Sequence, residues 1–256
     1  MSEIRVWQTE KAKLLDSEEL RAATKRVIGT GIPGTGKKFD SAAVATQIVD
    51  IVVSELNESG KGTNIETALS TLGALAGFSG QMAIREYFIK SGKITEEKAF
   101  ITVKAKNGFT YLFGDLLNEP LITSQQGQHS VWGFVGGAAQ GLGAKELPDM
   151  SELFRYVAGT VGGDSFGVPR LPSQNMPHSL PIVLLNRFWN PVRNLLAVNV
   201  DTPGSWPFVL GHAAQIAMIR AKAVIDPALA AKIVMESAVP MSKIDAAHVY
   251  HGYLTK

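Results

Sequence analysis

The sequence contains no cysteine, and only 19% of its 256 residues are charged. Without cysteine the chain has no disulfide framework, no thiolate zinc or iron–sulfur site and no cysteine nucleophile. The two signs of charge are also balanced, because 25 Lys and Arg residues stand against 23 Asp and Glu residues, a formal net charge of +2. Since nucleic acids and acidic membranes attract a marked excess of basic residues, we expect neither as a partner.

Signals for secretion or membrane insertion are also lacking. The first twenty residues alternate charged and single apolar residues and contain no apolar core of a signal peptide, so the cytoplasm is the expected compartment. The stretch 67–84 approaches the length of a membrane span but contains Ser, Thr, Gln and Gly residues, and Glu66 and Arg85 flank it. We interpret it as a buried pair of helices in a soluble protein.

Helical periodicity dominates the beginning of the chain. Apolar residues recur every three or four positions from 45 to 56, which predicts a helix that begins near Asp40. A further helix is predicted from Asn64 to about Ile89, with an interruption at 77–80. Its glycine and alanine residues would let another helix approach closely.

The clearest strand pattern lies between 99 and 113. Residues 99–106 alternate in polarity, and the run returns from Phe109 after the dipeptide Asn107-Gly108. This pattern predicts an antiparallel β-hairpin with a two-residue type I′ turn.

Prolines and capping residues mark the helices of the second half of the chain. Predicted helices begin near Pro148, Pro181, Pro207 and Asp226. Because proline removes a backbone donor, Pro191 is expected to bend or stop its helix and Pro240 to end the last one. The tail from Ala246 onward has little to hold it.

These elements predict a mainly α (α+β) fold, a multi-helix single domain over residues 1–256. It comprises a helical N-terminal region (1–95), a hairpin (99–113) and a helical C-terminal region (129–238). No repeat, linker or shift in composition indicates a second domain.

Residues 120–144 contain no Asp, Glu, Lys or Arg. We expect this stretch to be buried, either by the chain itself or by a second copy in a homo-oligomer, most simply a two-fold dimer.

A glycine-rich motif raises the possibility of nucleotide binding. GIPGTGK at 31–37 matches the first seven positions of a phosphate-binding P-loop. However, Lys38 stands where the magnesium-binding hydroxyl belongs, and the preceding residues 16–27 predict a helix rather than a strand. A loop between helices is the favoured interpretation, and nucleotide binding is the less favoured alternative.

Two short blocks point to ester hydrolysis. GDSF at 163–166 and DAAH at 245–248 resemble the first and last blocks of the GDSL-type serine hydrolases. The resemblance implies Ser165 as the nucleophile and His248 as its base, and His178 is a second candidate base. It covers eight residues, and the serine block stands two-thirds along the chain rather than near its start as in that family.

Metal and cofactor sites are not indicated. The short-spaced pair His248 and His251 has no nearby carboxylate except Asp245. We therefore predict no metal site, and no motif predicts a cofactor.

The long irregular segment 159–181 is the main functional candidate. Long loops inside compact domains tend to be functional or disordered, and apolar residues such as Phe166 and Leu171 favour an ordered surface here. The candidate ligand-binding residues are Asp164, Ser165, Arg170, Asn175 and His178. We expect a non-catalytic binding or interaction protein, with a serine hydrolase acting on small esters as the alternative.

Overall fold

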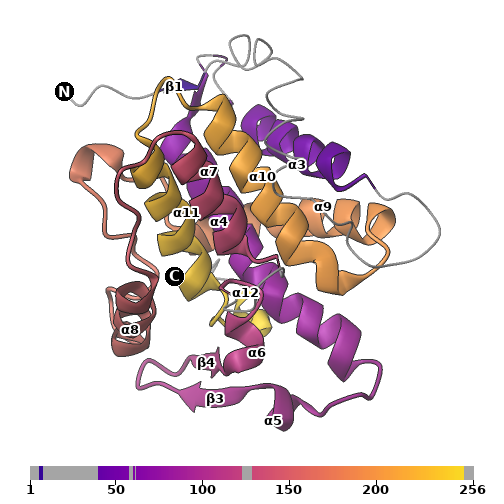
Figure 1. Ribbon diagram of the computed structural model, residues 1–256. Helices are drawn as coiled ribbons and strands as arrows, with labels where there is room; N and C mark the ends of the chain where they lie inside the picture. The colour runs from indigo at the N-terminus through magenta and orange to yellow at the C-terminus, as the bar shows by residue number, and fades with distance from the viewer. Residues whose placement is uncertain (1–5, 8–39, 58–59, 61, 123–128, 251–256) are drawn as a thin grey trace.

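The computed structural model describes residues 6–7, 40–57, 60, 62–122 and 129–250 (Figure 1). Within these residues the fold is mainly α with a small antiparallel hairpin, as the sequence predicts. The helices share one large hydrophobic core, and a smaller apolar cluster lies beneath the hairpin. The predicted helix at 16–27 and the glycine-rich motif at 31–37 lie outside the described residues.

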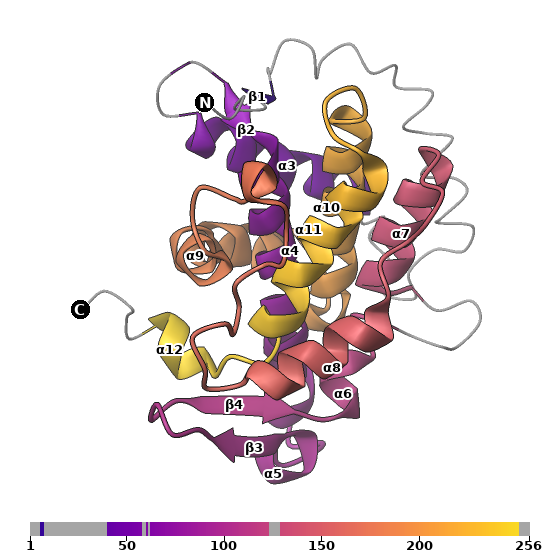
Figure 2. The ribbon, with the colours of Figure 1, turned by 90° about the vertical axis from the view of Figure 1, so that its left-hand side faces the viewer.

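Helix α4 (Ile65–Ile84) runs through the centre of the molecule, and every one of its residues is buried. Asn64 caps it by accepting the N–H of Thr67 at 2.8 Å. The helices packed against it are α3 (Ser41–Leu56), α9 (Pro181–Asn199), α10 (Trp206–Arg220) and α11 (Pro227–Met241) (Figure 1, Figure 2). A further helix, α7 (Val131–Gly141), covers α10 and α11. No helix in the described ranges combines the length and apolarity needed to cross a bilayer.

The interruption predicted within α4 is wrong, and the expected pair of helices is a single helix. It continues through Gly77 and Gly80 and changes only at its end, to a π-helical turn at Arg85–Ile89. At Gly73 and Gly77 a Cβ atom would overlap a backbone carbonyl of α11, so these glycines let the two helices touch. This packing outweighs the low helix propensity of glycine, about 1 kcal/mol per residue relative to alanine.

The other predicted helix boundaries hold to within a few residues. Helix α8 (Met150–Thr160) begins two residues after Pro148, where Asp149 accepts the N–H of Glu152. Helix α9 does not stop at Pro191, and this proline lies on the exposed face of the helix. Pro240 lies in the last turn of α11, close to the predicted end.

The hairpin consists of β3 (Ile101–Lys104) and β4 (Thr110–Phe113), with α5 (Glu96–Ala99) before it and α6 (Asp115–Asn118) after it. Its turn is not the two-residue type I′ turn that we predicted. The N–H of Ala105 donates to Phe109 O and that of Gly108 to Ala105 O, which leaves three residues in the loop. Gly108 has a φ of 82°, and Asn107 Oδ1 accepts the N–H of Phe109, so one glycine suffices for this longer turn. A second small ladder joins β1 (Val6–Trp7) to β2 (Thr63–Asn64).

The tail is held in place as far as Tyr250, contrary to expectation. Helix α12 (Ala246–Tyr250) lies beside the hairpin (Figure 2). The Nε2 atom of His248 accepts the N–H of Thr110 at 3.4 Å, and its ring meets that of Phe109 edge-on at 4.5 Å.

The charge-poor stretch is partly buried by the chain itself where the structure describes it, and its exposed residues include Gly133, Gly137 and Gln140. On α7, Val131, Phe134 and Val135 are buried, and they pack on α10 and α11. Residues 123–128 lie outside the described ranges. A second copy is therefore not needed to cover the apolar face of α7.

Candidate functional site

The segment between α8 and α9 is irregular, as predicted, and it crosses the surface beside α11 (Figure 2). It contains a single 3-10 turn at Ser173–Asn175. Phe166 meets Tyr111 edge-on with ring centres 4.8 Å apart, and both Phe166 and Leu171 pack against the core. These anchors hold the segment against the helices.

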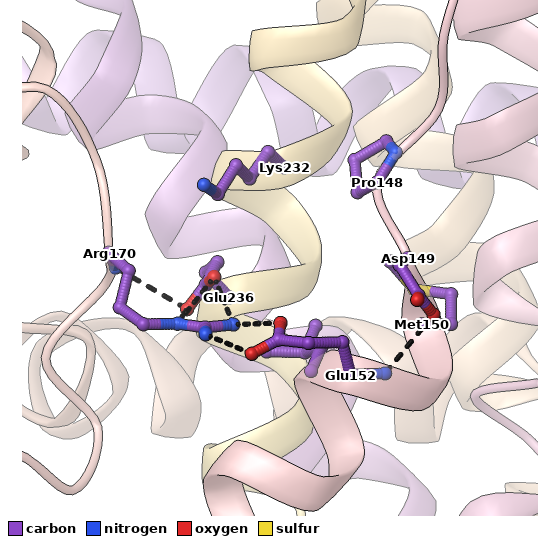
Figure 3. Close-up of a pocket in the computed structure, with 8 residues that line it drawn as sticks. Pro148, Asp149, Met150, Glu152, Arg170, Lys232 and Glu236 are labelled. Atoms are coloured by element: carbon purple, nitrogen blue, oxygen red, sulfur yellow. Dashed lines mark hydrogen bonds and ion pairs between the residues drawn. The ribbon is translucent and has the colours of Figure 1, made fainter.

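Arg170 is the strongest polar anchor of this segment. Its Nη1 atom lies 2.6 Å from Glu152 on α8, and its Nη2 atom lies 2.9 Å from Glu236 on α11 (Figure 3). The guanidinium carbon also sits 3.9 Å from the ring centre of Tyr156. Only 4% of the Glu236 side chain is exposed, so its carboxylate depends on Arg170 for its charge partner.

Arg170, Glu152 and Glu236 form a charged cluster in which each side chain stabilises the ionised form of its partner. The hydrogen bond from Arg170 holds the pKa of the Glu152 carboxyl below its ordinary value. In return, hydrogen bonds to Glu152 and Glu236 raise the pKa of the Arg170 guanidinium, although burial opposes them. Charge-assisted pairs with two carboxylates fix the position of the arginine more firmly than neutral hydrogen bonds would.

A cavity of about 220 Å³ adjoins the cluster, between the start of α8, α11 and Arg170. Its lining mixes charged and apolar residues: Pro148, Asp149, Met150, Glu152, Leu153, Arg170, Lys232 and Glu236. Lys232 lies one turn before Glu236 on α11, and its side chain extends toward the segment that carries Arg170 (Figure 3). Within the described residues Lys232 has no ion pair or hydrogen bond, whereas Arg170 is fully engaged.

The residues that the sequence singled out do not gather at one place. Arg170 lines the cavity, whereas Asp164 and Ser165 are exposed in the turns that follow α8. Asn175 is buried and donates from Nδ2 to Glu66 at 2.9 Å. The backbone N–H of His178 donates to Thr67 Oγ1 at 2.9 Å. Asn175 and His178 thus join the segment to the start of α4 rather than to the cavity.

Several lining residues escaped the sequence analysis because they lie on helices, far along the chain from Arg170. One signal was available. Glu236 is a lone carboxylate within the apolar run IVMESAVPM of α11, and a charge in such a run needs a buried partner. Asp149, Glu152 and Lys232 follow ordinary surface patterns and gave no signal.

The residues proposed for ester hydrolysis, Ser165 with His248 or His178, are not hydrogen-bonded to one another in the described part of the chain. His248 uses Nε2 to accept the backbone N–H of Thr110, and Ser165 is exposed. Among the residues that the structure describes, no hydrogen bond links Ser165 to His248 or to His178. The same residues contain no group of three or more potential metal ligands. Ester hydrolysis therefore rests on the sequence blocks alone and stays a prediction.

Two buried basic side chains lie outside the cavity. Lys243 donates from Nζ to Asn118 Oδ1 at 2.5 Å, and burial lowers its pKa to about 8. His212 stacks on Phe134 with ring centres 5.6 Å apart, and burial lowers its pKa to about 4. Neither nitrogen of the His212 ring has a hydrogen-bond partner among the described residues.

Comparisons of the chain with protein-family models, with curated proteins and with solved structures find no match.

Proposed function

We propose that this protein is a non-catalytic binding protein and that its ligand is a small zwitterion, a molecule with one anionic and one cationic group. The proposed site is the cavity between α8, α11 and Arg170 (Figure 3). The observation that carries the proposal is the pairing pattern of the lining: Lys232 lacks a partner in the described chain, while the acidic side chains outnumber the basic ones.

The anionic group of the ligand would pair with Lys232. A carboxylate placed there gains a charge-assisted hydrogen bond without displacing an existing ion pair. Arg170 is not available for this purpose, since Glu152 and Glu236 already engage its guanidinium.

The cationic group would face the acidic side of the cavity. Asp149 and Glu152 both stand at the start of α8, and their carboxylates retain acceptor capacity beyond the bonds that they make. Because Arg170 donates hydrogen bonds to Glu152, the carboxylate of Glu152 is held in a fixed position. Less side-chain entropy is therefore lost when a ligand binds.

The size of the cavity and its apolar lining restrict the ligand further. A volume of about 220 Å³ lies below the usual range for drug-sized ligands and suits a molecule of amino-acid size. Pro148, Met150 and Leu153 offer apolar surface for a short side chain or linker.

Isothermal titration calorimetry with a panel of free amino acids tests the proposal. Matched probes that lack one charge, primary amines and simple carboxylates of similar size, are titrated beside them. We expect saturable binding of at least one zwitterion and at least tenfold weaker binding of its single-charge analogues. Lys232→Met should weaken binding at least tenfold, whereas Lys145→Met, an exposed lysine that does not line the cavity, should leave it unchanged.

Absence of binding by every zwitterion at millimolar concentration would overturn the proposal, as would equal affinity in the Lys232→Met variant.

The expected cytoplasmic location belongs to the same proposal, and cell fractionation tests it. The hydrolase alternative has its own test: small-ester hydrolysis that is lost in Ser165→Ala would establish it.

A further inference from the structure

Strand β3 is the outer edge of the hairpin. In both ribbon views β4 lies between β3 and the helical core, and β3, with α5 beside it, faces outward (Figure 1, Figure 2). All four residues of β3 are exposed, including 65% of Ile101 and 37% of Val103. An exposed strand edge with apolar side chains is a ready surface for pairing with another strand.

The backbone hydrogen bonds show which groups of β3 are free. The N–H of Ala105 donates to Phe109 O, so residue 105 faces β4. Since successive residues of a strand direct their backbone groups to opposite sides, Ile101 and Val103 also bond to β4, and Thr102 and Lys104 face away from it. The partner of Thr102 agrees with this alternation, because the N–H of Leu112 donates to Lys243 O at 2.7 Å and not to β3.

Thr102 and Lys104 therefore present N–H and C=O groups at an edge where the described chain places no other strand. We propose that the occupant of this edge is a second copy of this chain. Two β3 strands would pair antiparallel about a two-fold axis at Val103, with Thr102 of each copy opposite Lys104 of the other. The result is a continuous four-stranded sheet in the order β4–β3–β3–β4.

Charge favours this antiparallel arrangement of identical strands. Lys104 ends β3 and Lys106 lies in the turn that follows, whereas Glu97 of α5 lies beyond the other end of the strand, exposed and without an ion pair in the described chain. Antiparallel pairing brings Lys106 of one copy opposite Phe100 of the other, near its Glu97. Parallel pairing would instead set lysine against lysine, which is unfavourable.

Apolar contact adds to the backbone bonds. Ile101 and Val103 point to the same face of the hairpin, since they alternate with Thr102. In the proposed register Val103 meets Val103 of the second copy, and Ile101 meets Ala105. The most exposed apolar side chain of the hairpin is then covered. Because four-residue strands bury little surface, we expect a weak dimer that forms at high protein concentration.

Sedimentation equilibrium of the full chain over a wide concentration range tests the proposal. We expect a monomer–dimer equilibrium in the original protein. Thr102→Pro removes an outward-facing N–H and leaves the β3–β4 bonds in place, so it should weaken the dimer at least tenfold. Ile101→Lys should do the same by placing a charge in the contact. Val198→Lys, at a side chain of α9 that is 83% exposed, is the control and should have no effect.

Exchanging the charges of Glu97 and Lys106 tests the proposed β3–β3 register without introducing a proline into the strand. Glu97→Lys and Lys106→Glu should each weaken the dimer, and the double variant should restore it. Circular dichroism verifies that each variant is folded. A protein that stays monomeric at the highest concentration overturns the proposal. So does a dimer that Thr102→Pro and Ile101→Lys leave unchanged, because its interface then lies elsewhere.

Discussion

Gly77 of α4 packs directly against the backbone of Ala238 in α11, so closely that a Cβ atom on Gly77 would overlap the Ala238 carbonyl oxygen. One turn earlier, Gly73 stands in the same relation to Val234. The pair of serines Ser70 and Ser237 joins the same two helices, with hydroxyl oxygens 2.9 Å apart. The central helix and α11 therefore meet in direct backbone contact at Gly73 and Gly77, and a pair of serine hydroxyls adds to this contact.

Gly77→Ala should destabilise the protein strongly. Both backbones are buried and cannot move apart without opening the core, so we expect a loss of about 3 kcal/mol in the free energy of unfolding despite the better helix propensity of alanine. Gly80→Ala is the control, because the nearest atom to its added Cβ is Pro120 Cβ at 3.8 Å. Urea denaturation measures both, and equal effects would contradict the close contact.

Arg170→Met should weaken the hold on the segment between α8 and α9. It leaves the buried Glu236 carboxylate without its charge partner, which typically reduces the free energy of unfolding by about 3 kcal/mol. Limited proteolysis should then cut residues 161–172 faster than in the original protein. Arg155→Met removes an exposed arginine of the neighbouring helix α8 and should change neither result. Unchanged cleavage in Arg170→Met would show that the apolar anchors suffice.

His212 should make the protein less stable in acid. Burial lowers its pKa from 6.5 to about 4, and the charge of Asp40 opposes this only partially. Between these two pH values the unfolded chain binds the proton more readily, so stability falls as the pH falls from 6.5 toward 4. From pH 7 to pH 5 the loss amounts to about 2 kcal/mol.

His212→Leu separates this contribution from that of the carboxyl groups. The difference in unfolding free energy between the variant and the original protein should shift in favour of the variant by that amount between pH 7 and pH 5. Urea titrations at the two pH values measure it. A difference that does not vary with pH would mean that folding leaves the pKa of His212 unchanged.

Lys243→Met should stabilise the protein at neutral pH. Burial lowers the pKa of Lys243 from 10.5 to about 8, so below pH 8 the folded protein carries a buried ammonium whose only hydrogen bond in the described chain is to Asn118. Removing that charge should raise the free energy of unfolding by about 2 kcal/mol at pH 7, after allowance for the lost hydrogen bond.

The pH dependence of this gain identifies its cause. Above pH 8 the folded protein loses the proton, and by pH 10.5 the burial penalty has gone, so the gain should disappear over this interval. Thermal unfolding of both proteins from neutral pH to the upper end of this interval follows it, with Lys145→Met as an exposed control. A variant that is less stable at neutral pH would show that Lys243 contributes more through Asn118 than its burial costs.

The helices could be predicted from local patterns because those patterns act over a few residues. The apolar spacing of 45–56 predicts α3, and caps such as Asn64 and Asp226 mark where α4 and α11 begin. The two positions where a predicted break did not occur differ in their surroundings. Gly77 has low helix propensity, but its close packing against α11 favours the helix, whereas Pro191 lies on the exposed face of α9.

The candidate site was only partly accessible to sequence reasoning. The segment 159–181 and Arg170 were identified, because irregular length and apolar anchors are visible along the chain. The partners of Arg170 were not, since Glu236 lies 66 positions away and no local pattern specifies which buried charges pair.

By itself the sequence determined the fold class, the positions of the main helices and the presence of a β-hairpin, because hydrophobic period, caps and turn residues act locally. Only the tertiary structure decided that two helices meet at Gly77, that Arg170 joins α8 to α11, and that Lys232 faces a cavity without a partner in the described chain. These relationships depend on how separate segments are brought together, and that follows from the burial of the whole core rather than from any one stretch of residues.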